Sequence, residues 1–150
     1  MSKYLNKLYS DGIRKHNETP FHFEKKVEAQ HRLRAYNPIC GDRFDVYLDV
    51  EQKSILRIHF HGYGCAISKA STSVMANAIE GKSLGDGLEL CNNFLGFINK
   101  EMNREAVNLP SDFFSFAGVH DFPDRYECAS LSWREVKKFL ESCMNPTQSQ

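Results

Sequence analysis

Three of the five cysteines lie where the chain is expected to turn or to begin a helix. Cys40, Cys65 and Cys128 each come close to a proline or a glycine, residues that mark the boundaries of helices and strands. Thiolates bind zinc and other soft metal ions, and groups at the ends of elements can converge from distant parts of a chain. Together the three cysteines therefore indicate a metal site assembled from separate segments.

Cys65 stands where a strand pattern has ended and a helix is expected to begin. Gly62 and Gly64, just before it, let the backbone turn tightly through conformations that other residues avoid. A thiol at a helix N-terminus sits in the positive end of the helix dipole, which favours the thiolate that binds metal or attacks sulfur. The alternative is a buried cysteine at a strand-to-helix corner, and this stretch alone leaves both interpretations open.

A fourth ligand is available next to the first cysteine. Gly41 separates Cys40 from Asp42, and residues two apart in an extended segment point to the same side. Both side chains are therefore expected to face one ion. Asp42 is alternatively a turn residue whose carboxylate accepts hydrogen bonds from the local backbone. A Cys-x-Asp pair is a weak signal by itself and gains weight only from Cys65 and Cys128.

The remaining cysteines and a pair of histidines have ordinary structural explanations. Cys91 and Cys143 lie on apolar stripes of expected helices, where free cysteine behaves as a small hydrophobic residue. His59 and His61 lie two apart on an expected strand and would share one face, but histidines at strand edges are common. Because the number of cysteines is odd and a reducing compartment is expected, the sequence argues against a disulfide framework.

The overall composition bounds the class of protein. The chain has 150 residues, of which 41% are hydrophobic and 25% charged, as in an ordinary single domain. Its 19 basic and 19 acidic side chains cancel, so no global field points to nucleic acid or to an anionic membrane. The sequence shows no apolar export segment at its start and no run long enough to span a bilayer. We therefore expect a cytoplasmic protein that binds neither nucleic acid nor a membrane.

The elements between the thiols must position them. Alternating apolar residues predict three antiparallel strands, and helical spacing predicts helices before and after them. The predicted strands are 31–36, 44–50 and 55–60, and the predicted helices are 3–16, 65–80, 84–102 and one that starts near Cys128, with a short helical or irregular insert at 110–119. In the third strand, alternation puts Leu56 on the same face as Ile58 and Phe60. These elements form one domain over residues 1–150, with a frayed tail from about 145.

Three segments resemble a known family. They are Asn-Pro-Ile-Cys-Gly-Asp at 37–42, Phe-His-Gly-Tyr-Gly-Cys-Ala-Ile-Ser-Lys-Ala-Ser at 60–71 and Glu-Cys-Ala-Ser-Leu-Ser-Trp at 127–133. They resemble the U-type iron–sulfur cluster assembly proteins, IscU and the NifU N-terminal domain, and most closely SufU, over nearly the whole chain. The resemblance implies an α+β fold with a three-stranded antiparallel sheet covered by helices. It also implies a zinc ion held by Cys40, Asp42, Cys65 and Cys128, and work with a cysteine desulfurase.

Two features make the resemblance closer to SufU than to IscU. IscU-type scaffolds have a histidine directly before the third cysteine and a Leu-Pro-Pro-Val-Lys segment upstream. Here Glu127 precedes Cys128, and the upstream residues are Phe-Pro-Asp-Arg-Tyr at 122–126. The insert between Leu88 and Cys128 is also longer, as in SufU, and Arg125 matches a SufU arginine three residues before the cysteine. Glu127 departs from both subfamilies.

The resemblance implies a division of roles among the ligands. Cys40, in the loop with the most freedom, is the expected sulfur acceptor, while Cys65 and Cys128 are expected to hold the ion. Zinc keeps thiolates deprotonated without oxidising them, and a thiolate that leaves the ion can attack a persulfide. Lys69 and Arg125 are expected to offset the negative charge of the site, unless they are ordinary surface charges.

The expected function is zinc-dependent transfer of sulfur from a SufS-type cysteine desulfurase to downstream iron–sulfur assembly proteins. Whether such an acceptor counts as an enzyme stays open. The main alternative is a scaffold on which an iron–sulfur cluster is built at the same cysteines, because thiolates suit both zinc and clusters. A structural zinc-binding adaptor without sulfur chemistry is a third interpretation.

Overall fold

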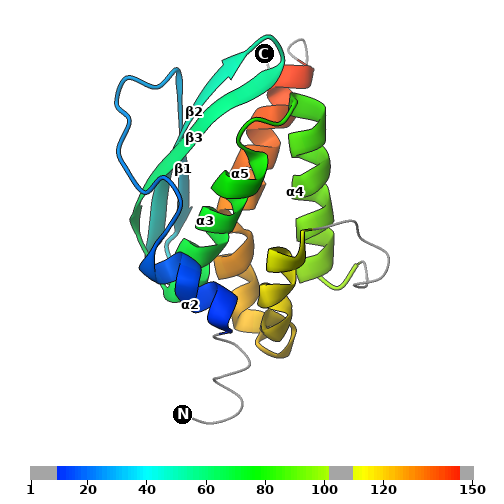
Figure 1. Cartoon of the computed structure of the whole chain (residues 1–150). Coiled ribbons are helices and arrows are strands. Elements are labelled where there is room, and N and C mark those ends of the chain that lie inside the picture. The colour runs from blue at the N-terminus through cyan, green and yellow to red at the C-terminus, as the bar shows by residue number, and fades with distance from the viewer. Residues whose placement is uncertain (1–9, 102–109, 146–150) are drawn as a thin grey trace.

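The structure, a computed structural model, describes residues 10–101 and 110–145, and there the chain forms a sheet packed against helices (Figure 1). Its elements are, in chain order, α2 (Asp11–Glu18), β1 (His31–Asn37), β2 (Asp42–Glu51), β3 (Ser54–Tyr63), α3 (Ala66–Ile79), α4 (Leu84–Ile98), the 3-10 helices η1 (Ser111–Asp121) and η2 (Pro123–Arg125), and α5 (Tyr126–Met144). This order confirms the predicted α+β class, with one domain built around a three-stranded antiparallel sheet.

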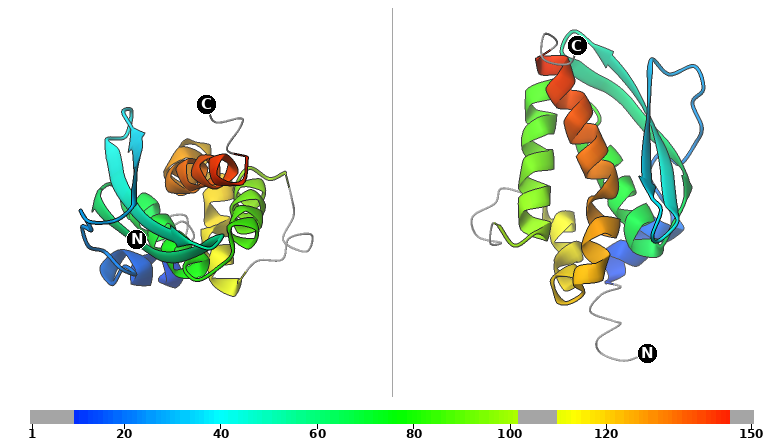
Figure 2. Two further views of the ribbon diagram at one scale, coloured as in Figure 1. Left: turned by 90° about the horizontal axis from the view of Figure 1, so that it is seen from above. Right: turned by 180° about the vertical axis from the view of Figure 1, so that it is seen from behind.

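The two faces of the sheet differ sharply. The strand order is β1-β2-β3, and both pairs are antiparallel. On β2, Phe44, Val46 and Leu48 are fully buried in the core, whereas Arg43 and Asp45 point to the opposite face and stay partly exposed. Side chains on a strand alternate between faces, so the alternation predicted for the strand at 44–50 is confirmed. One face therefore packs on the helices, and no described helix covers the other (Figure 2).

The predicted alternation fails at the start of β3. A register shift between Asp49 and Val50 of β2 marks a β-bulge, and in the part of β3 opposite it Ile55 is fully buried while Leu56 is 46% exposed. A bulge sets two residues of one strand against one of the other and so reverses the faces of the side chains beyond it. The prediction that Leu56 belongs to the core face is therefore wrong.

Helices α3 and α5 lie between the sheet and α4 (Figure 2). Small side chains let the two helices approach closely, and several of their buried polar groups pair with one another. Trp133 Nε1 donates to Ser71 Oγ at 3.0 Å, and Ser71 Oγ donates to the Ala129 carbonyl oxygen at 2.5 Å. The hydroxyls of Thr72 and Ser132 lie 2.7 Å apart. Because buried polar groups are costly without partners, these bonds fix the first half of α5 in one position on α3.

Aromatic rings fill the core beneath α5. Phe94 of α4 stacks on Trp133 with 4.3 Å between ring centroids, and Phe113 and Phe116 of η1 meet Phe94 edge-on at 5.4 and 5.7 Å. Such pairs contribute about 0.5–1.5 kcal/mol each beyond their burial. The phenylalanine-rich insert predicted at 110–119 is thus a 3-10 helix that completes the core.

Several predicted boundaries shift. Helix α4 ends at Ile98, before the predicted end at 102, whereas α5 begins at Tyr126, near Cys128 as predicted. The first helix covers Asp11–Glu18, and the apolar positions predicted for it at 4–9 lie outside the described residues, as do residues 146–150 of the predicted tail. Within the described ranges, none of the helices combines the length and the apolar character that crossing a membrane requires.

Candidate metal centre

Three connections meet at one end of the sheet: the turn between β1 and β2, the link from β3 to α3, and the start of α5 (Figure 1). The turn carries Cys40, and Asp42 is the first residue of β2. Their ligand atoms and the Cys128 sulfur all lie within 4.8 Å of one another, the one such group among residues 10–101 and 110–145. The structure therefore brings three of the four predicted ligands together, and it places Cys65 against Cys128.

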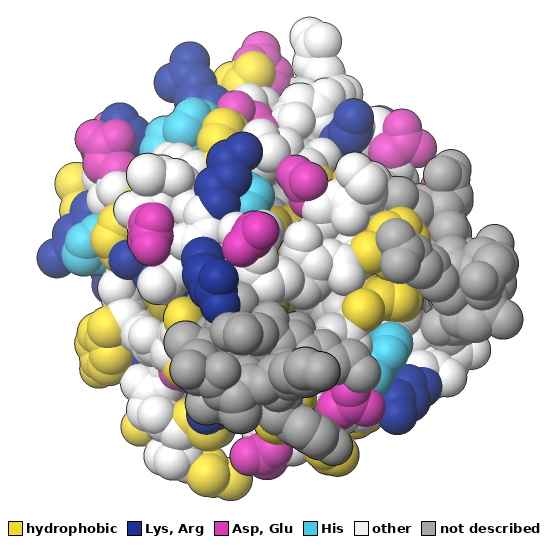
Figure 3. All heavy atoms as spheres, turned by 60° about the horizontal axis from the view of Figure 1, so that its bottom comes forward, with side chains coloured by type: hydrophobic (Ala, Val, Ile, Leu, Met, Phe, Trp, Pro, Cys, Tyr) yellow, Lys and Arg dark blue, Asp and Glu magenta, His cyan; other side chains and the backbone are white. Residues whose placement is uncertain are grey.

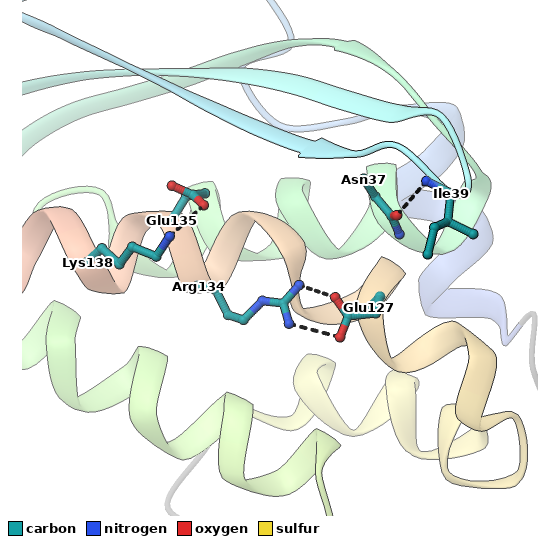
Figure 4. Close-up of polar contacts among 6 residues, drawn as sticks. All are labelled: Asn37, Ile39, Glu127, Arg134, Glu135 and Lys138. Carbon is teal, nitrogen blue, oxygen red and sulfur yellow. Dashed lines mark hydrogen bonds and ion pairs between the residues drawn. The ribbon is translucent and has the colours of Figure 1, made fainter.

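The turn that carries Cys40 is held by its backbone and by one side chain. The N–H of Gly41 donates to the Asn37 carbonyl oxygen at 2.7 Å, and the N–H of Ile39 donates to Asn37 Oδ1 at 3.1 Å (Figure 4). Gly41 has a φ of +78°, which glycine adopts without steric cost. The prediction of an extended segment from Cys40 to Asp42 is wrong, because the turn itself brings the two side chains together.

Asp42 is 1% exposed although its side chain is acidic. Its Oδ1 accepts a hydrogen bond from the Cys65 backbone N–H at 2.9 Å, whereas its Oδ2 is buried and accepts none from the described residues. Leaving such an oxygen buried and unpaired costs about 1–3 kcal/mol or more, and a bound cation would remove that cost. The alternative role as a turn residue accounts for Oδ1 alone.

Cys65 and Cys128 lie side by side and are hydrogen-bonded to each other. Cys65 is the N-cap of α3, where its sulfur accepts a hydrogen bond from the Ser68 N–H at 3.4 Å. A hydrogen bond from the Cys128 thiol lowers the pKa of Cys65 to about 6, with help from the Ser68 amide and against the effect of burial. The same hydrogen bond, together with burial, raises the pKa of Cys128. The helix start and the hydrogen bond from Cys128 both favour the thiolate form of Cys65.

Two glycines make room for this arrangement. A Cβ at Gly64 would lie 2.7 Å from Asp42 Oδ1 and 2.9 Å from the Phe44 ring, and a Cβ at Gly62 would lie 2.1 Å from the Arg43 carbonyl oxygen. Any side chain would therefore push the link between β3 and α3 away from β2. Sequence reasoning connected these glycines with turning and missed the close approach, for which the Gly-x-Gly spacing before a cysteine was the available signal.

The donor set fits a metal centre. The sulfurs of Cys40 and Cys128 and the carboxylate of Asp42 converge, and the Cys65 sulfur adjoins that of Cys128, so four donor groups are available. Zinc takes cysteine sulfur and carboxylate oxygen, usually as four ligands, and cysteine thiolates also hold iron–sulfur clusters. The buried Oδ2 of Asp42 is the group that gains most from a cation. The chemistry of the site is therefore compatible with either occupant.

The two basic residues predicted to support the site occupy different positions. Lys69 lies on α3 and directs its Nζ over the Phe23 ring, 4.6 Å from the centroid. Such a cation–π contact contributes about 0.5–1 kcal/mol at an exposed site. Arg125 is the residue directly before α5. Lys69 therefore has a structural partner in the loop before β1, besides the expected role of offsetting the negative charge of the site.

The other cysteines and the two histidines lie elsewhere. Cys91 is fully buried on α4, and burial raises its pKa to about 12. Cys143 lies in the last turn of α5, where burial also raises its pKa. His59 and His61 each stack on an aromatic ring of the loop before β1, with centroids 4.4 and 4.8 Å apart. These placements agree with the structural explanations given for all four residues.

Glu127, which departs from both subfamilies, is engaged on the surface of α5. Arg134 donates to both of its carboxylate oxygens, and the distance from Nη1 to Oε1 is 3.0 Å (Figure 4). The hydrogen bonds from Arg134 lower the pKa of Glu127. Sequence reasoning missed this pair, although two helical turns separate the acid from the base and place both on one side of the helix.

Large apolar side chains are exposed around this end of the molecule. Ile39 is 93% exposed, Tyr63 62% and Tyr36 54%. Figure 3 brings the end at which α3 and α5 begin toward the viewer, and hydrophobic side chains lie there at the surface among charges of both signs. Cys40, beside Ile39 in the turn, is exposed as well. The accessible thiol is thus flanked by side chains of the kind that contact other proteins.

Similarity to known proteins extends over most of the chain. The family model of the NifU-like N terminal domain matches residues 8–129. The iron–sulfur cluster assembly scaffold protein IscU of Streptococcus pyogenes serotype M1 is 31% identical, over 94% of this chain and 87% of its own. The zinc-dependent sulfurtransferase SufU of Bacillus subtilis is 34% identical, over 68% of this chain and 69% of its own.

Solved structures share the fold. A crystal structure from Fervidobacterium islandicum AW-1, provisionally described as an iron–sulfur cluster assembly scaffold protein for the SUF system, has a TM-score of 0.79 at 28% identity, and the match covers 88% of this chain and 96% of that one. A NifU-like protein (N-terminal) from Brucella abortus has a TM-score of 0.71 at 20% identity over 91% and 94%, which concerns the fold alone. The segment matched by the family model contains all four predicted ligand positions.

Proposed function

The chain belongs to the family of NifU-like N-terminal domains, and from this premise we propose that it is a zinc-dependent sulfur-transfer protein in iron–sulfur cluster assembly. In this proposal it accepts persulfide sulfur from a SufS-type cysteine desulfurase and passes it to downstream iron–sulfur assembly proteins. The names of two relatives support the role, since one is a cluster assembly scaffold and the other a zinc-dependent sulfurtransferase.

The observation that carries the proposal is the unequal exposure of the ligands. Cys40 is exposed in a turn, whereas Asp42 and Cys128 are each 1% exposed, yet their ligand atoms lie within 4.8 Å of one another. A partner can therefore reach Cys40 without opening the core, while the buried ligands keep hold of the ion. A purely structural zinc site is closed on all sides, so this asymmetry favours transfer.

Zinc bound by Cys40, Asp42, Cys65 and Cys128 would keep the thiols deprotonated at neutral pH and would supply no redox chemistry. The Cys40 thiolate attacks the outer sulfur of a persulfide on the desulfurase cysteine. A new sulfur–sulfur bond forms at Cys40 as the old one breaks, and the donor cysteine leaves as a thiolate with the bonding electron pair. The outer sulfur keeps its proton and carries it to Cys40. The exchange therefore needs neither oxidant nor reductant.

Neighbouring residues have supporting roles in this proposal. Arg125, directly before α5, and Lys69, on α3, partly offset the negative charge of three thiolates and a carboxylate. The exposed side chain of Ile39 contacts the desulfurase as it approaches Cys40. Free thiols of this kind suit a reducing compartment such as the cytosol.

A scaffold is the second candidate, favoured by the convergence of cysteine ligands and by relatives that are named scaffolds. Against it, the residue before Cys128 supplies no imidazole, and Glu127 in that place is held by Arg134. The purified protein separates the two roles. A colourless protein with one zinc supports transfer, and a brown protein with iron and sulfide supports the scaffold.

Sulfur transfer is tested by incubating the protein with a cysteine desulfurase and free cysteine, followed by mass spectrometry of its peptides. In the wild type, one sulfur atom should be added to the Cys40 peptide. Cys40→Ser should keep part of its zinc but accept no sulfur and no longer stimulate the desulfurase. Cys143→Ser is the matched control, because it also removes a thiol but lies at the other end of α5.

Three outcomes would contradict the proposal. The persulfide would appear on Cys65 or Cys128 rather than on Cys40, Cys40→Ser would stimulate the desulfurase normally, or a cluster would assemble and transfer without zinc. The last outcome would support the scaffold instead.

A further inference from the structure

The sheet face that no described helix covers carries a regular grid of basic and aromatic side chains. Cross-strand partners share a face, so the pairing register defines its rows. Counted from the end of the sheet at the metal centre, which we call the thiol end, these rows are Tyr36, Arg43 and Tyr63, then Arg34, Asp45 and His61, then Arg32, Tyr47 and His59. The first row adjoins the metal centre, because Arg43 follows Asp42 in the chain and Tyr63 precedes Gly64.

The loop between α2 and β1 crosses this face (Figure 2). It is fastened at the β3 edge, where the Glu24 N–H donates to the Phe60 carbonyl oxygen at 2.8 Å, and on β2, where the Gln30 N–H donates to Asp49 Oδ1 at 2.9 Å. Between the loop and the ends of the strands it leaves a recess of about 410 Å³. The recess has the size of a small binding site rather than of a surface crease.

Positive charge dominates the recess. Lys25, Arg32 and Arg43 line it together with a single carboxylate, that of Asp45. This carboxylate is already bound by Arg32 at 2.7 Å and by Arg34 at 3.1 Å. In the described part of the chain, neither Lys25 nor Arg43 takes part in an ion pair. Because the whole chain is electrically neutral, this local excess of cations is a feature of the face and not of the composition.

Apolar surface lies beside the cations. Val27 at the recess is 83% exposed, and Tyr63 on its other wall is 62% exposed. On the left margin of Figure 3, which is the side of the sheet in Figure 1, basic, histidine and hydrophobic side chains adjoin one another. Exposed apolar groups next to unpaired cations match a ligand that is itself both apolar and anionic.

We propose that this recess is a docking site for an acidic segment of a partner protein. Carboxylates of the segment pair with Lys25 and Arg43, and an apolar side chain between them packs on Val27 and Tyr63. Because Arg43 and Tyr63 of the first row line the recess, a partner bound there would lie close to the exposed Cys40 turn. The site needs neither the metal nor sulfur transfer, so it stands apart from the function proposed above.

A nucleic acid fits this face less well. Stacking of bases requires open aromatic rings in a row. Here Tyr47 is 3% exposed, with the Arg32 guanidinium 5.9 Å from its ring centroid, and Phe23 stacks on His61. The crossing loop covers the middle of the grid, so the open part is a recess for a short segment and not a platform for a strand.

The proposal is tested by fluorescence polarisation with a labelled peptide that alternates glutamate and phenylalanine, using the full-length protein as purified. The peptide should bind at low salt and more weakly as salt is added. Lys25→Glu and Arg43→Glu should each weaken binding about fivefold or more, because each reversal turns an attraction into a repulsion. Lys137→Glu, a reversal in the groove between α4 and α5, should bind the peptide like the wild type.

Amide NMR signals place the peptide. Changes in chemical shift on addition of the peptide should be confined to the recess, including Arg43 and Gly62. The amide signals of α4 should not change. The proposal is overturned if the wild type does not bind the peptide, if a glutamine version binds equally well, or if both reversals leave binding unchanged. Tighter binding of a single-stranded oligonucleotide of equal charge would overturn it in favour of a nucleic acid. Lys25 lies in a loop, so its reversal remains informative even if Arg43→Glu fails to fold.

Discussion

The two ends of α5 carry the same residue type in opposite surroundings. Cys128, in the first turn, lies within 4.8 Å of ligand atoms from the β1–β2 turn and donates a hydrogen bond to Cys65. Cys143, in the last turn, has its pKa raised by burial and belongs to no cluster of metal-binding side chains within the described ranges. One end gathers ligands from three connections, and the other packs a single thiol among helices.

The difference shows that the reactivity of a cysteine depends on which helix ends, strand ends and turns meet beside it. At the first end, a glycine-permitted turn brings Cys40 and Asp42 to Cys128, and a helix N-terminus brings Cys65 beside it. At the far end and on α4, neighbouring residues of regular helices surround the sulfurs of Cys143 and Cys91, and burial favours the neutral thiol. Four changes test this difference between the two ends: removing the metal, replacing the ligands, filling the space beside them and breaking a neighbouring ion pair.

Removing the metal should have the largest effect. Binding of zinc to small structural sites contributes about 10–16 kcal/mol, comparable to the stability of a whole domain. Chelation should therefore lower the melting temperature by about 10 °C or more, and acid should do the same because protons compete for the thiolates. Calorimetry with and without a chelator measures the change. An unchanged melting curve after proven loss of zinc would mean that the thiol end holds no stabilising ion.

Replacing single cysteines separates the two ends. Cys65→Ser or Cys128→Ser should lose most of the bound zinc and abolish stimulation of a desulfurase. Cys91→Ala and Cys143→Ala should retain both, at a cost of about 1–2 kcal/mol or less in the free energy of unfolding from lost packing. Metal analysis and denaturant unfolding give both quantities. If Cys91→Ala lost zinc while Cys128→Ser kept it, the assignment of the metal ligands would be wrong.

The fold could be predicted to a large extent, because its signals are periodic. Alternation marks β2, where Phe44 and Val46 are fully buried, and helical spacing marks α3, α4 and α5. The predictions that were wrong concern features that depend on contacts between residues far apart in the sequence. The bulge that exposes Leu56 and buries Ile55 arises from the pairing of β2 with β3. The alternation of apolar residues within β3 does not predict it.

The site was predictable in its residue types but not in its geometry. Cys40, Asp42 and Cys128 do come together, yet the reason given for the first two was wrong, since a turn and not an extended segment joins them. The hydrogen bond from Cys128 to Cys65, and the contact that requires glycine at 64, depend on atoms brought from different elements. Such contacts follow from packing, which no single segment encodes.

Filling the space at Gly64 should have an intermediate effect. In Gly64→Ala the new Cβ would lie 2.7 Å from Asp42 Oδ1, so the carboxylate or the link must move away from the thiols. Overpacking of this kind costs about 1–3 kcal/mol, and zinc affinity should fall by about tenfold or more. Gly85→Ala is the matched control, because no atom lies within 4 Å of its Cβ position. Competition with a zinc-binding dye measures the affinity, and equal affinities in the two variants would contradict the close approach.

The smallest effect is expected from Arg134→Gln, which tests whether the residue before Cys128 belongs to the site. Hydrogen bonds from Arg134 lower the pKa of Glu127, so the stability that the pair contributes is present above the ordinary glutamate pKa and is lost as the pH falls through the lowered value. Both side chains are largely exposed, and solvent screening limits that contribution to about 0.2–1 kcal/mol at pH 7. Carbon NMR of the carboxyl group should show the pKa of Glu127 rising toward its ordinary value in the variant. Zinc content and sulfur transfer should not change, because the pair lies on the surface of α5 and donates nothing to the thiols. Loss of zinc in Arg134→Gln would instead tie Glu127 to the metal centre and extend the reactive end of α5 by one residue.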